Sequence, residues 1–301
     1  MIVVKLMGGL GNQLFQYAFG ISLSNKLNSD VAYDISSFIN DSVRKLRLNS
    51  LGLSLKYKNR SCIFVILMKL ARYCSGRSRL VRSFNLLKRI ESAYEMKTAF
   101  FYKIIKEADF NIGTIPQTKN YYFDGYWQNP AYFEDVRPII LKNINFPDLQ
   151  NAQDLNLRNW IVNSESVAIH IRRGDYVENR QYNDFYGTCS PEYYRKAIDR
   201  ISSEISNAKF FLFTDDPDFV EANFDFLPTK TLVSDKQRSE IDDLNLMHSC
   251  KHFIIANSSF SWWGAWLSQN PQKIVVAPKQ WYKNEEANEQ CKIVPKDWIK
   301  I

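Results

Sequence analysis

Several features that mark common protein classes are scarce in this chain of 301 residues. It has five cysteines, an odd number with no C-x-x-C pair, and only three histidines. Scattered cysteines fit a reducing compartment and disfavour a zinc site. The longest apolar run covers residues 62–68, whereas about 20 residues are needed to cross a bilayer. Because the first ten residues also lack a signal-peptide pattern, we expect a cytoplasmic protein.

Acidic residues are fewer than basic residues, and the difference comes from one stretch of the chain. The sequence has 39 Lys and Arg residues against 32 Asp and Glu, a formal net charge of +7. Residues 56–106 hold thirteen basic and two acidic residues, so this stretch carries +11 and the rest of the chain −4. A protein coated in positive charge to bind nucleic acid is therefore not expected. We expect the basic stretch to be helical, as a solvated face or as a peripheral contact with the anionic surface of the inner membrane.

Strand and helix patterns alternate in both halves of the chain. A short apolar run at residues 2–7, a helical pattern at 12–27 and a second run at 31–35 predict a βαβ unit with a parallel sheet. Turn signals between residues 111 and 165 suit an interdomain region. The second half predicts strands at 167–171, 210–213, 252–256 and 273–277 and helices at 191–205, 241–250 and 260–267.

We therefore predict an α/β protein with two Rossmann-like domains facing a central cleft. At roughly 150 residues per domain, the length suits an N-terminal domain of residues 1–155 and a C-terminal domain of residues 156–301. Ligands bind at the carboxyl ends of the strands in such sheets. Four polar clusters follow predicted strands directly.

The first cluster, residues 8–13 (GGLGNQ), lies between the first strand and the first helix. Glycines there would let backbone N–H groups approach a phosphate, and the helix N-terminus would add positive potential. The dinucleotide fingerprint is only half met, because Leu14 stands where the third glycine belongs. An anion site that includes Gly11 and Asn12, and a tight turn with Asn12 as N-cap, are both open.

The second cluster, residues 170–176 (HIRRGDY), combines one histidine, two arginines and an aspartate. Strand alternation puts His170 and Arg172 on one face, and Arg173 begins the turn. Two arginines at the end of a strand suit bidentate recognition of phosphate. The alternative is an ion pair within the loop, with Asp175 as the partner.

The third cluster, residues 214–218 (TDDPD), follows the strand predicted at 210–213. Asp216 and Asp218 have the D-x-D spacing by which carboxylates hold a divalent ion against a diphosphate. Asp-Pro is also a common helix start, and we favour a cap for Asp216. Asp215 could accept hydrogen bonds from the N–H edge of guanine.

The fourth cluster, residues 257–266 (NSSFSWWGAW), lies between a predicted strand and a predicted helix. Hydroxyl groups in this place make a second anion site, because the first-turn N–H groups of a helix lack partners. Ser259 as an ordinary N-cap is the alternative. Nearby aromatic and histidine residues are expected to be structural: Trp262, Trp263, Trp266, His248 and His252.

In their order along the chain, the clusters resemble the bacterial α-1,2-fucosyltransferases of glycosyltransferase family 11. The resemblance rests on residues 8–17, 170–176, 214–216 and 257–265, with 125–128 (GYWQ) as a further match. It implies a GT-B-like fold, GDP-fucose as donor, inversion at the anomeric carbon of fucose, and no required metal or other cofactor. It also implies a β-galactoside-terminated glycan as acceptor, fucosylated at O2 during the synthesis of a surface polysaccharide such as O-antigen.

The resemblance further implies roles for individual residues. Arg172 would hold the β-phosphate, with Arg173 supporting its loop, while His170 and Asp215 would contact guanine. Ser258 and Ser259 would contact the diphosphate, and Gly11 and Asn12 would reach the donor from the other domain. The C-terminal domain would bind GDP-fucose, whereas the N-terminal domain would be the acceptor side, with residues 177–188 also shaping the acceptor site.

Several alternatives stay open. A general base could be Asp175 or Asp34, although a dissociative transition state needs no strong base. The linkage or the GDP-sugar could differ. An NAD(P)-dependent oxidoreductase built on the first βαβ unit is a different class, against which the absent third glycine argues. A nucleotide-binding module without catalysis is another.

Overall fold

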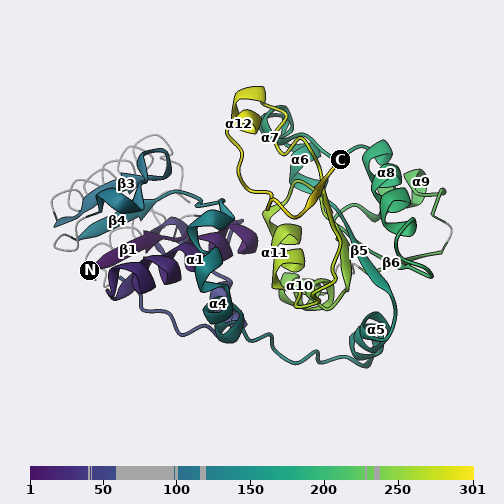
Figure 1. Ribbon diagram of the computed structural model, residues 1–301, viewed down its shortest axis with the longest axis horizontal. Helices are drawn as coiled ribbons and strands as arrows, with labels where there is room; N and C mark the ends of the chain where they lie inside the picture. Colours follow the sequence, from purple (N-terminus) through teal and green to yellow (C-terminus); the bar gives the residue numbers. More distant parts are fainter. Residues whose placement is uncertain are drawn as a thin grey trace, which may run out of the picture. The chain divides into compact units, whose positions relative to one another are not determined.

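The chain forms two α/β units, each with its own parallel sheet (Figure 1). Unit 1 comprises residues 1–49 and 53–143, and unit 2 comprises residues 50–52 and 144–301. The boundary predicted at 155/156 would fall inside helix α5 (Ala152–Val162), which belongs to unit 2 because its buried Asp154 pairs with Arg238. The computed structural model describes residues 1–39, 41, 43–58, 98, 101–115, 120–227, 229–233 and 238–301.

Unit 1 is a four-stranded sheet in the order β2-β1-β4-β3, with every pair parallel. Helix α1 (Leu10–Leu27) connects β1 to β2 and buries its apolar side chains, which confirms the predicted βαβ unit. The other elements of the unit are β1 (Ile2–Lys5), β2 (Val31–Asp34), β3 (Lys103–Lys106), β4 (Tyr121–Asp124) and α4 (Arg137–Asn143).

Two expectations for this unit are wrong. Strand β4 lies within the region interpreted as interdomain, where its aromatic side chains Tyr121 and Phe123 are buried in the core of unit 1. Strand β3 lies at the end of the basic stretch, for which a helix is predicted. The connecting segments of the chain form 3-10 helices at Ser36–Phe38, Leu48–Leu51, Glu107–Asp109, Ile112–Thr114, Pro130–Tyr132 and Glu134–Val136.

Most of the basic stretch, residues 59–97, lies outside the described residues, so its predicted helix and its membrane contact stay predictions. At its edges, lysines form ion pairs within unit 1. Lys56 binds Asp30 at 3.0 Å and Lys106 binds Asp124 at 2.6 Å. Among the described residues, no helix is both long enough and apolar enough to span a membrane.

Unit 2 is a six-stranded parallel sheet in the order β10-β9-β8-β5-β6-β7. Its strands are β5 (Ser166–Ile171), β6 (Lys209–Thr214), β7 (Lys230–Leu232), β8 (His252–Ile254), β9 (Val275–Ala277) and β10 (Ile299–Lys300). Its helices after α5 are α6 (Gly174–Glu178), α7 (Arg180–Tyr186), α8 (Pro191–Ser202), α9 (Pro217–Asn223), α10 (Glu240–His248), α11 (Ser259–Leu267) and α12 (Glu285–Glu289).

The strand order of unit 2 reverses between β5 and β8. From β5 the chain continues to β6 on one side, whereas from β8 it continues to β9 on the other side. Since the two connections diverge, a crevice opens at the carboxyl ends of these two neighbouring strands. The second and fourth polar clusters follow β5 and β8, so both reach this switch point.

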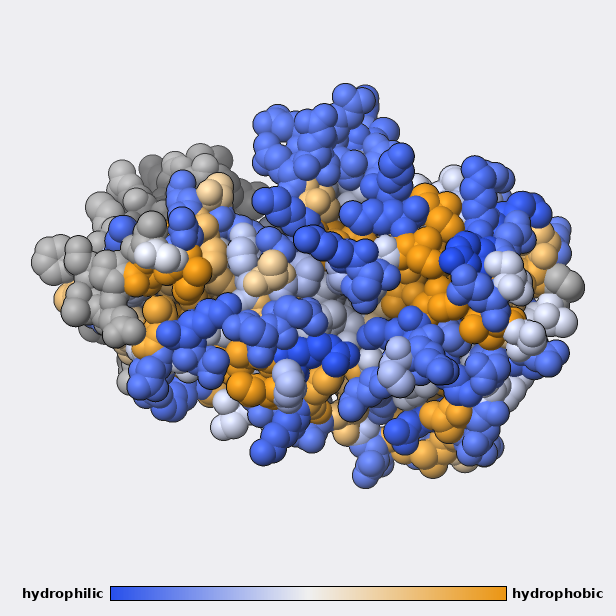
Figure 2. Space-filling view, in the orientation of Figure 1, coloured by the Kyte–Doolittle hydropathy of each residue, from blue (hydrophilic) through white to orange (hydrophobic). Residues whose placement is uncertain are grey.

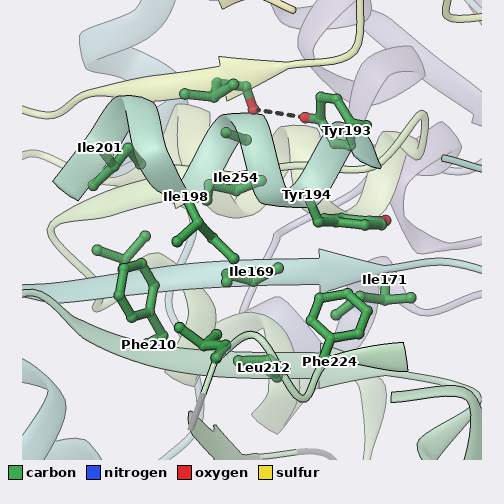
Figure 3. Close-up of a cluster of buried hydrophobic side chains, with 14 of the residues drawn as sticks. Ile169, Ile171, Tyr193, Tyr194, Ile198, Ile201, Phe210, Leu212, Phe224 and Ile254 are labelled. Carbon is green, nitrogen blue, oxygen red and sulfur yellow. Dashed lines mark hydrogen bonds between the residues drawn. The ribbon is translucent and has the colours of Figure 1, made fainter. Parts of the chain in front are cut away.

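The core of unit 2 forms where α8 packs on the sheet. Figure 3 shows Tyr194 and Ile198 of α8 facing Ile169 of β5 and Leu212 of β6, all of them buried. The tryptophans of the fourth cluster are buried as predicted, since Trp262 and Trp263 have no exposed surface and Trp266 has 3%.

Close packing of α11 against α10 depends on Gly264. A Cβ atom at this position would overlap Sδ of Met247 and lie 2.8 Å from its Cγ. We expect Gly264→Ala to lower the free energy of unfolding by about 1–3 kcal/mol, measured by urea denaturation, because the core has no room for the methyl group. Met247→Ala removes the atoms that the new methyl group would meet. The double variant should therefore lose less free energy of unfolding than the two single losses added together, and losses that simply add would contradict this packing.

Candidate functional site

Two charged pairs join the carboxyl ends of β5 and β6. The register that pairs Ile171 with Thr214 places the next residues, Arg172 and Asp215, beside each other. Nη1 of Arg172 donates to Oδ2 of Asp215 at 2.5 Å, and the backbone N–H of Arg173 donates to Oδ1 of the same carboxylate at 2.8 Å. Asp215 therefore fixes both the guanidinium group of Arg172 and the backbone that follows it.

The second pair anchors the loop to α9. Nε of Arg173 donates to Asp216 at 2.9 Å, and the guanidinium group lies 3.7 Å from the ring centroid of Phe219. Asp216 also accepts from the backbone N–H of Phe219 as N-cap of α9, which confirms the predicted cap. The hydrogen bond from Arg173 is the main reason why the pKa of Asp216 lies below its usual value.

Within the described part of the chain, no three His, Cys, Asp or Glu side chains are grouped so that they could hold a metal ion.

Gly174 lets the aspartate reach this position. A Cβ atom at residue 174 would lie 2.7 Å from Oδ2 of Asp215, the oxygen that binds Arg172. Any larger residue would push the carboxylate away from the arginine. The glycine after the two arginines is thus part of the electrostatic arrangement.

At the carboxyl end of β8, the fourth cluster turns into α11. Ser258 is the N-cap, and its side chain accepts from the N–H of Phe260. The predicted cap, Ser259, is instead the first residue of the helix, because the extended backbone ends one residue earlier. The side chain of Asn257 donates to the carbonyl groups of Tyr186, Gly187 and Trp281 at 2.9–3.2 Å. The amide thus ties the loop after β8 to two other segments.

His170 is buried behind the arginines, with 7% of its surface exposed. Its Nδ1 atom is buried and has no hydrogen-bond partner among the described residues. Burial, with a smaller effect of the Arg172 charge, lowers the pKa of the imidazole from 6.5 to about 3, so the ring is neutral at physiological pH. A neutral ring can donate from one nitrogen and accept at the other.

In unit 1, buried amide side chains connect the loops after β1 and β4. Gln16 accepts from the N–H of Met7 and donates to the carbonyl of Gly125. Oδ1 of Asn12 accepts from Nε2 of Gln128 at 2.7 Å. The first cluster and residues 125–128 therefore meet at one edge of the sheet.

The structure corrects the predicted cap of α1. Gly9 is the N-cap, and Asn12 lies in the first turn with its side chain over Gly8. Gly8 has a φ of +79°, which suits glycine, and a Cβ atom there would lie 2.5 Å from Nδ2 of Asn12. Gly11 is buried within the helix. The donor contacts predicted for Gly11 and Asn12 stay predictions.

Comparison with known proteins identifies the family of this arrangement. The sequence profile of Glycosyl transferase family 11 matches residues 1–301, the whole chain. The chain belongs to glycosyl transferase family 11. It is 31% identical to an α-1,2-colitosyltransferase of Escherichia coli, over 100% of this chain and 98% of that protein. It is 30% identical to the O-antigen biosynthesis glycosyltransferase WbnK of Escherichia coli, over 98% and 99% of the two chains.

The chain also has more distant similarities to one sequence relative and to one solved structure. The galactoside 2-alpha-L-fucosyltransferase Sec1 of Mus musculus is 28% identical over 48% of this chain and 42% of its own length. The crystal structure of NodZ alpha-1,6-fucosyltransferase, soaked with GDP-fucose, superposes with a TM-score of 0.51 at 14% identity, covering 91% and 94% of the two chains. This structural likeness, with two units of parallel sheet, confirms the GT-B-like α/β fold, and family membership removes the oxidoreductase alternative.

The two candidates for a general base are the carboxylates of Asp175 and Asp34. The side chain of Asp175, as a base or as an ion-pair partner, lies outside the described part of this family 11 protein. Asp34 is fully buried and accepts from the hydroxyl of Tyr122 and the N–H of Ser36. These contacts give Asp34 a structural role, because it has no exposed surface from which to reach a substrate.

Sequence reasoning missed one acidic residue at the edge of the unit 1 sheet. Oε2 of Glu107 accepts from the N–H groups of Tyr126 and Trp127 at 2.9 and 2.7 Å, and burial raises its pKa. Trp127 has a φ of +58°, which is rare for a residue other than glycine. Glu107 thus holds the strained loop that carries Gln128. No motif marks it, and the strand that it follows, β3, is not detectable from the sequence either.

Two histidines with lowered pKa values predict an acid-sensitive fold for this family 11 protein. Burial lowers the pKa of His170 to about 3 and that of His248, which stacks on Phe146, to about 4. Both values lie below 6.5, so from pH 6.5 downwards the unfolded chain binds more protons than the folded one. We expect the free energy of unfolding to fall by up to about 1.4 kcal/mol per pH unit for each histidine between pH 6 and pH 4.

Urea denaturation across this pH range measures the slope. His248→Phe removes one titrating group and should make the slope shallower, whereas Arg200→Ala, at a partly exposed position of α8, should leave it unchanged. A stability independent of pH between 6 and 4 would contradict the burial of these rings.

Proposed function

We propose that this protein is an inverting α-1,2-fucosyltransferase, which transfers L-fucose from GDP-fucose to O2 of a terminal β-galactose. Family 11 membership supports glycosyl transfer, the WbnK relative supports a role in O-antigen synthesis, and the Sec1 relative supports a galactoside acceptor. The observation that carries the proposal is the fixed guanidinium group of Arg172 at the switch point, next to the strand that leads into α11.

We call Arg172, Ser258 and the first turn of α11 the diphosphate cradle. In the proposed reaction, the bond between C1 of fucose and the β-phosphate oxygen breaks, and the bonding electrons stay on GDP. Negative charge grows on the leaving diphosphate, and fixed donors that match this charge lower the barrier. Because Asp215 already orients Arg172, little reorganisation is needed when the charge develops.

Attack by the acceptor hydroxyl from the opposite face of the sugar inverts the anomeric carbon. The proton of that hydroxyl leaves to a base or to solvent, and Asp175 stays the candidate base. On the nucleoside side, the neutral imidazole of His170, 7% exposed, and the carboxylate of Asp215 are the proposed guanine contacts. Ser259, Arg173, Gly11 and Asn12 are the further proposed contacts to the donor.

Colitose is the second candidate for the transferred sugar. The E. coli relative matched along the whole chain at 31% identity is named an α-1,2-colitosyltransferase. Colitose is L-fucose without its 3-hydroxyl group, so both donors share the diphosphate and the reacting carbon. A site that hydrogen-bonds the 3-hydroxyl would reject colitose strongly.

The proposal is tested by incubating the purified chain with lactose and either GDP-fucose or GDP-colitose, with and without EDTA. We expect GDP release with GDP-fucose, activity that persists in EDTA, and a product whose linkage by NMR is α-1,2 to galactose. Faster transfer from GDP-colitose would select the second candidate. No GDP release from either donor, or a different linkage, would overturn the proposal.

A further inference from the structure

A cavity of about 770 Å³ opens beside the diphosphate cradle, entirely within unit 2. Its floor comes from the carboxyl ends of β8 and β9, through Asn257 and the segment after Ala277. Its wall comes from α7 and the connector to α8, including Asn183 and Thr188. A volume of this size is typical of ligand pockets. The cavity lies on the side of the switch point away from β6 and Asp215.

The lining suits a hydroxyl-rich ligand. Amide and hydroxyl side chains predominate, and such groups both donate and accept, as sugar hydroxyls do. Among the described residues that line the cavity, none is acidic, and Lys279 and Lys283 add donors. Figure 2 shows a predominantly hydrophilic surface over α7 and α12, the helices that contribute Asn183 and Asn288. Phe185 and Tyr182 on α7 are 40% and 42% exposed, so aromatic faces stand beside the polar groups.

A continuous set of contacts links this cavity to the candidate phosphate site. The guanidinium group of Arg172 lies 5.5 Å from the ring centroid of Tyr176. Tyr176 stacks on Tyr186, with ring centroids 4.9 Å apart, and Tyr186 lines the cavity. Asn257 lines the cavity as well and directly precedes Ser258. A ligand in the cavity therefore lies one aromatic stack away from the group proposed to bind the leaving phosphate.

We propose that this cavity is the acceptor subsite, and that it binds the oligosaccharide whose terminal galactose receives the sugar. The inference rests on the proposed function. The nucleoside would occupy the β6 side of the cradle through Asp215, which leaves the β8–β9 side to the second substrate. Asn183 would form hydrogen bonds with the hydroxyl groups of the acceptor, and Tyr186 would supply an apolar face for its C–H groups.

Steady-state kinetics with lactose and GDP-fucose test this inference. We expect Asn183→Ala to raise the KM for lactose by about tenfold, because a hydrogen-bonding partner is lost. Thr188→Trp, which narrows the cavity, should raise this KM further. The matched control is Gln181→Ala, an exposed residue on the same helix that does not line the cavity. The KM for GDP-fucose and the dissociation constant of GDP, measured by calorimetry, should stay within twofold in all three variants.

The outcomes separate the two proposals. A lactose KM within twofold of the original in both cavity variants, with transfer intact, would overturn the acceptor subsite alone. The acceptor subsite is also overturned if Gln181→Ala has an equal effect or if the cavity variants weaken GDP binding, since the cavity would then serve the fold or the donor. If the protein without substitutions transfers no sugar to lactose, the proposed function is wrong and the acceptor subsite is wrong with it.

Discussion

Replacing Arg172 by alanine should lower kcat by about 100-fold or more, because the proposed contact between its guanidinium group and the leaving diphosphate is lost. The guanidinium group is held by Asp215 at 2.5 Å, so it does not have to be ordered when substrate binds. Arg172→Lys should recover little of the loss, since an ammonium group cannot bind a carboxylate and a phosphate through one planar fork. GDP release from GDP-fucose in the presence of lactose is the measurement.

Two further variants make this result specific. Arg173→Ala should lower kcat by about tenfold or less, because that side chain is bound to Asp216 and Phe219 and supports the loop. Arg200→Ala should have no effect, because that partly exposed side chain pairs with Glu204 at the other end of α8, away from the loop. If Arg172→Ala kept near-normal turnover, or if Arg173→Ala were the more damaging change, the assignment of the phosphate contact would be wrong.

Replacing Arg238 by methionine should lower the free energy of unfolding by about 3–5 kcal/mol, because a buried carboxylate loses its counter-charge. The side chains of Arg238 and Asp154 are only 5% and 3% exposed, and Nε of the arginine donates to Asp154 at 2.9 Å. The same guanidinium group also binds Asp243 and the carbonyl of Val233. The arginine therefore joins α5, α10 and the end of β7, and urea denaturation measures its contribution.

A double variant separates lost pairing from lost packing. Asp154→Leu together with Arg238→Met removes both charges of the buried pair and should recover much of the stability lost in Arg238→Met, since the carboxylate that stays, Asp243, has a side chain that is 20% exposed. A loss below about 1 kcal/mol in the single variant, or a double variant no better than the single one, would contradict the role of the pair.

Apolar runs are enough to predict several of the buried strands, although the aromatic strand β4 is missed. Strand β5 is predicted at residues 167–171 and spans Ser166–Ile171, because a short apolar run rich in β-branched residues is typical of a buried parallel strand. Strand β3 (KIIK) escapes prediction because it is an edge strand with exposed lysines at both ends, so it has no apolar run to detect. Helix α7 escapes it because its sequence, RQYNDFY, is polar on most sides.

The candidate site could likewise be predicted from the sequence only in part. Strand ends can be located from the sequence, so the polar clusters are predicted in their correct places. The pairing of Arg172 with Asp215 could not be predicted, because the two residues are 43 positions apart and only the register of β5 and β6 brings them together. Likewise, Asn257 could be placed in a motif, but its three carbonyl partners come from segments that no pattern connects to it.

In unit 2, residues at the strand ends and residues in the connectors differ in how freely they can change during evolution. Arg172 and Ser258 lie within a few residues of strand ends, where the paired strands fix the start of each loop, so a changed length would move these side chains relative to the sheet. The residues that line the cavity belong largely to connectors, which tolerate insertions and substitutions. With the two sites placed as proposed, we expect related enzymes to keep the contacts to the diphosphate while diverging in the glycans they modify. Exchanging residues 177–190 between such relatives is a practical route to redirecting the product.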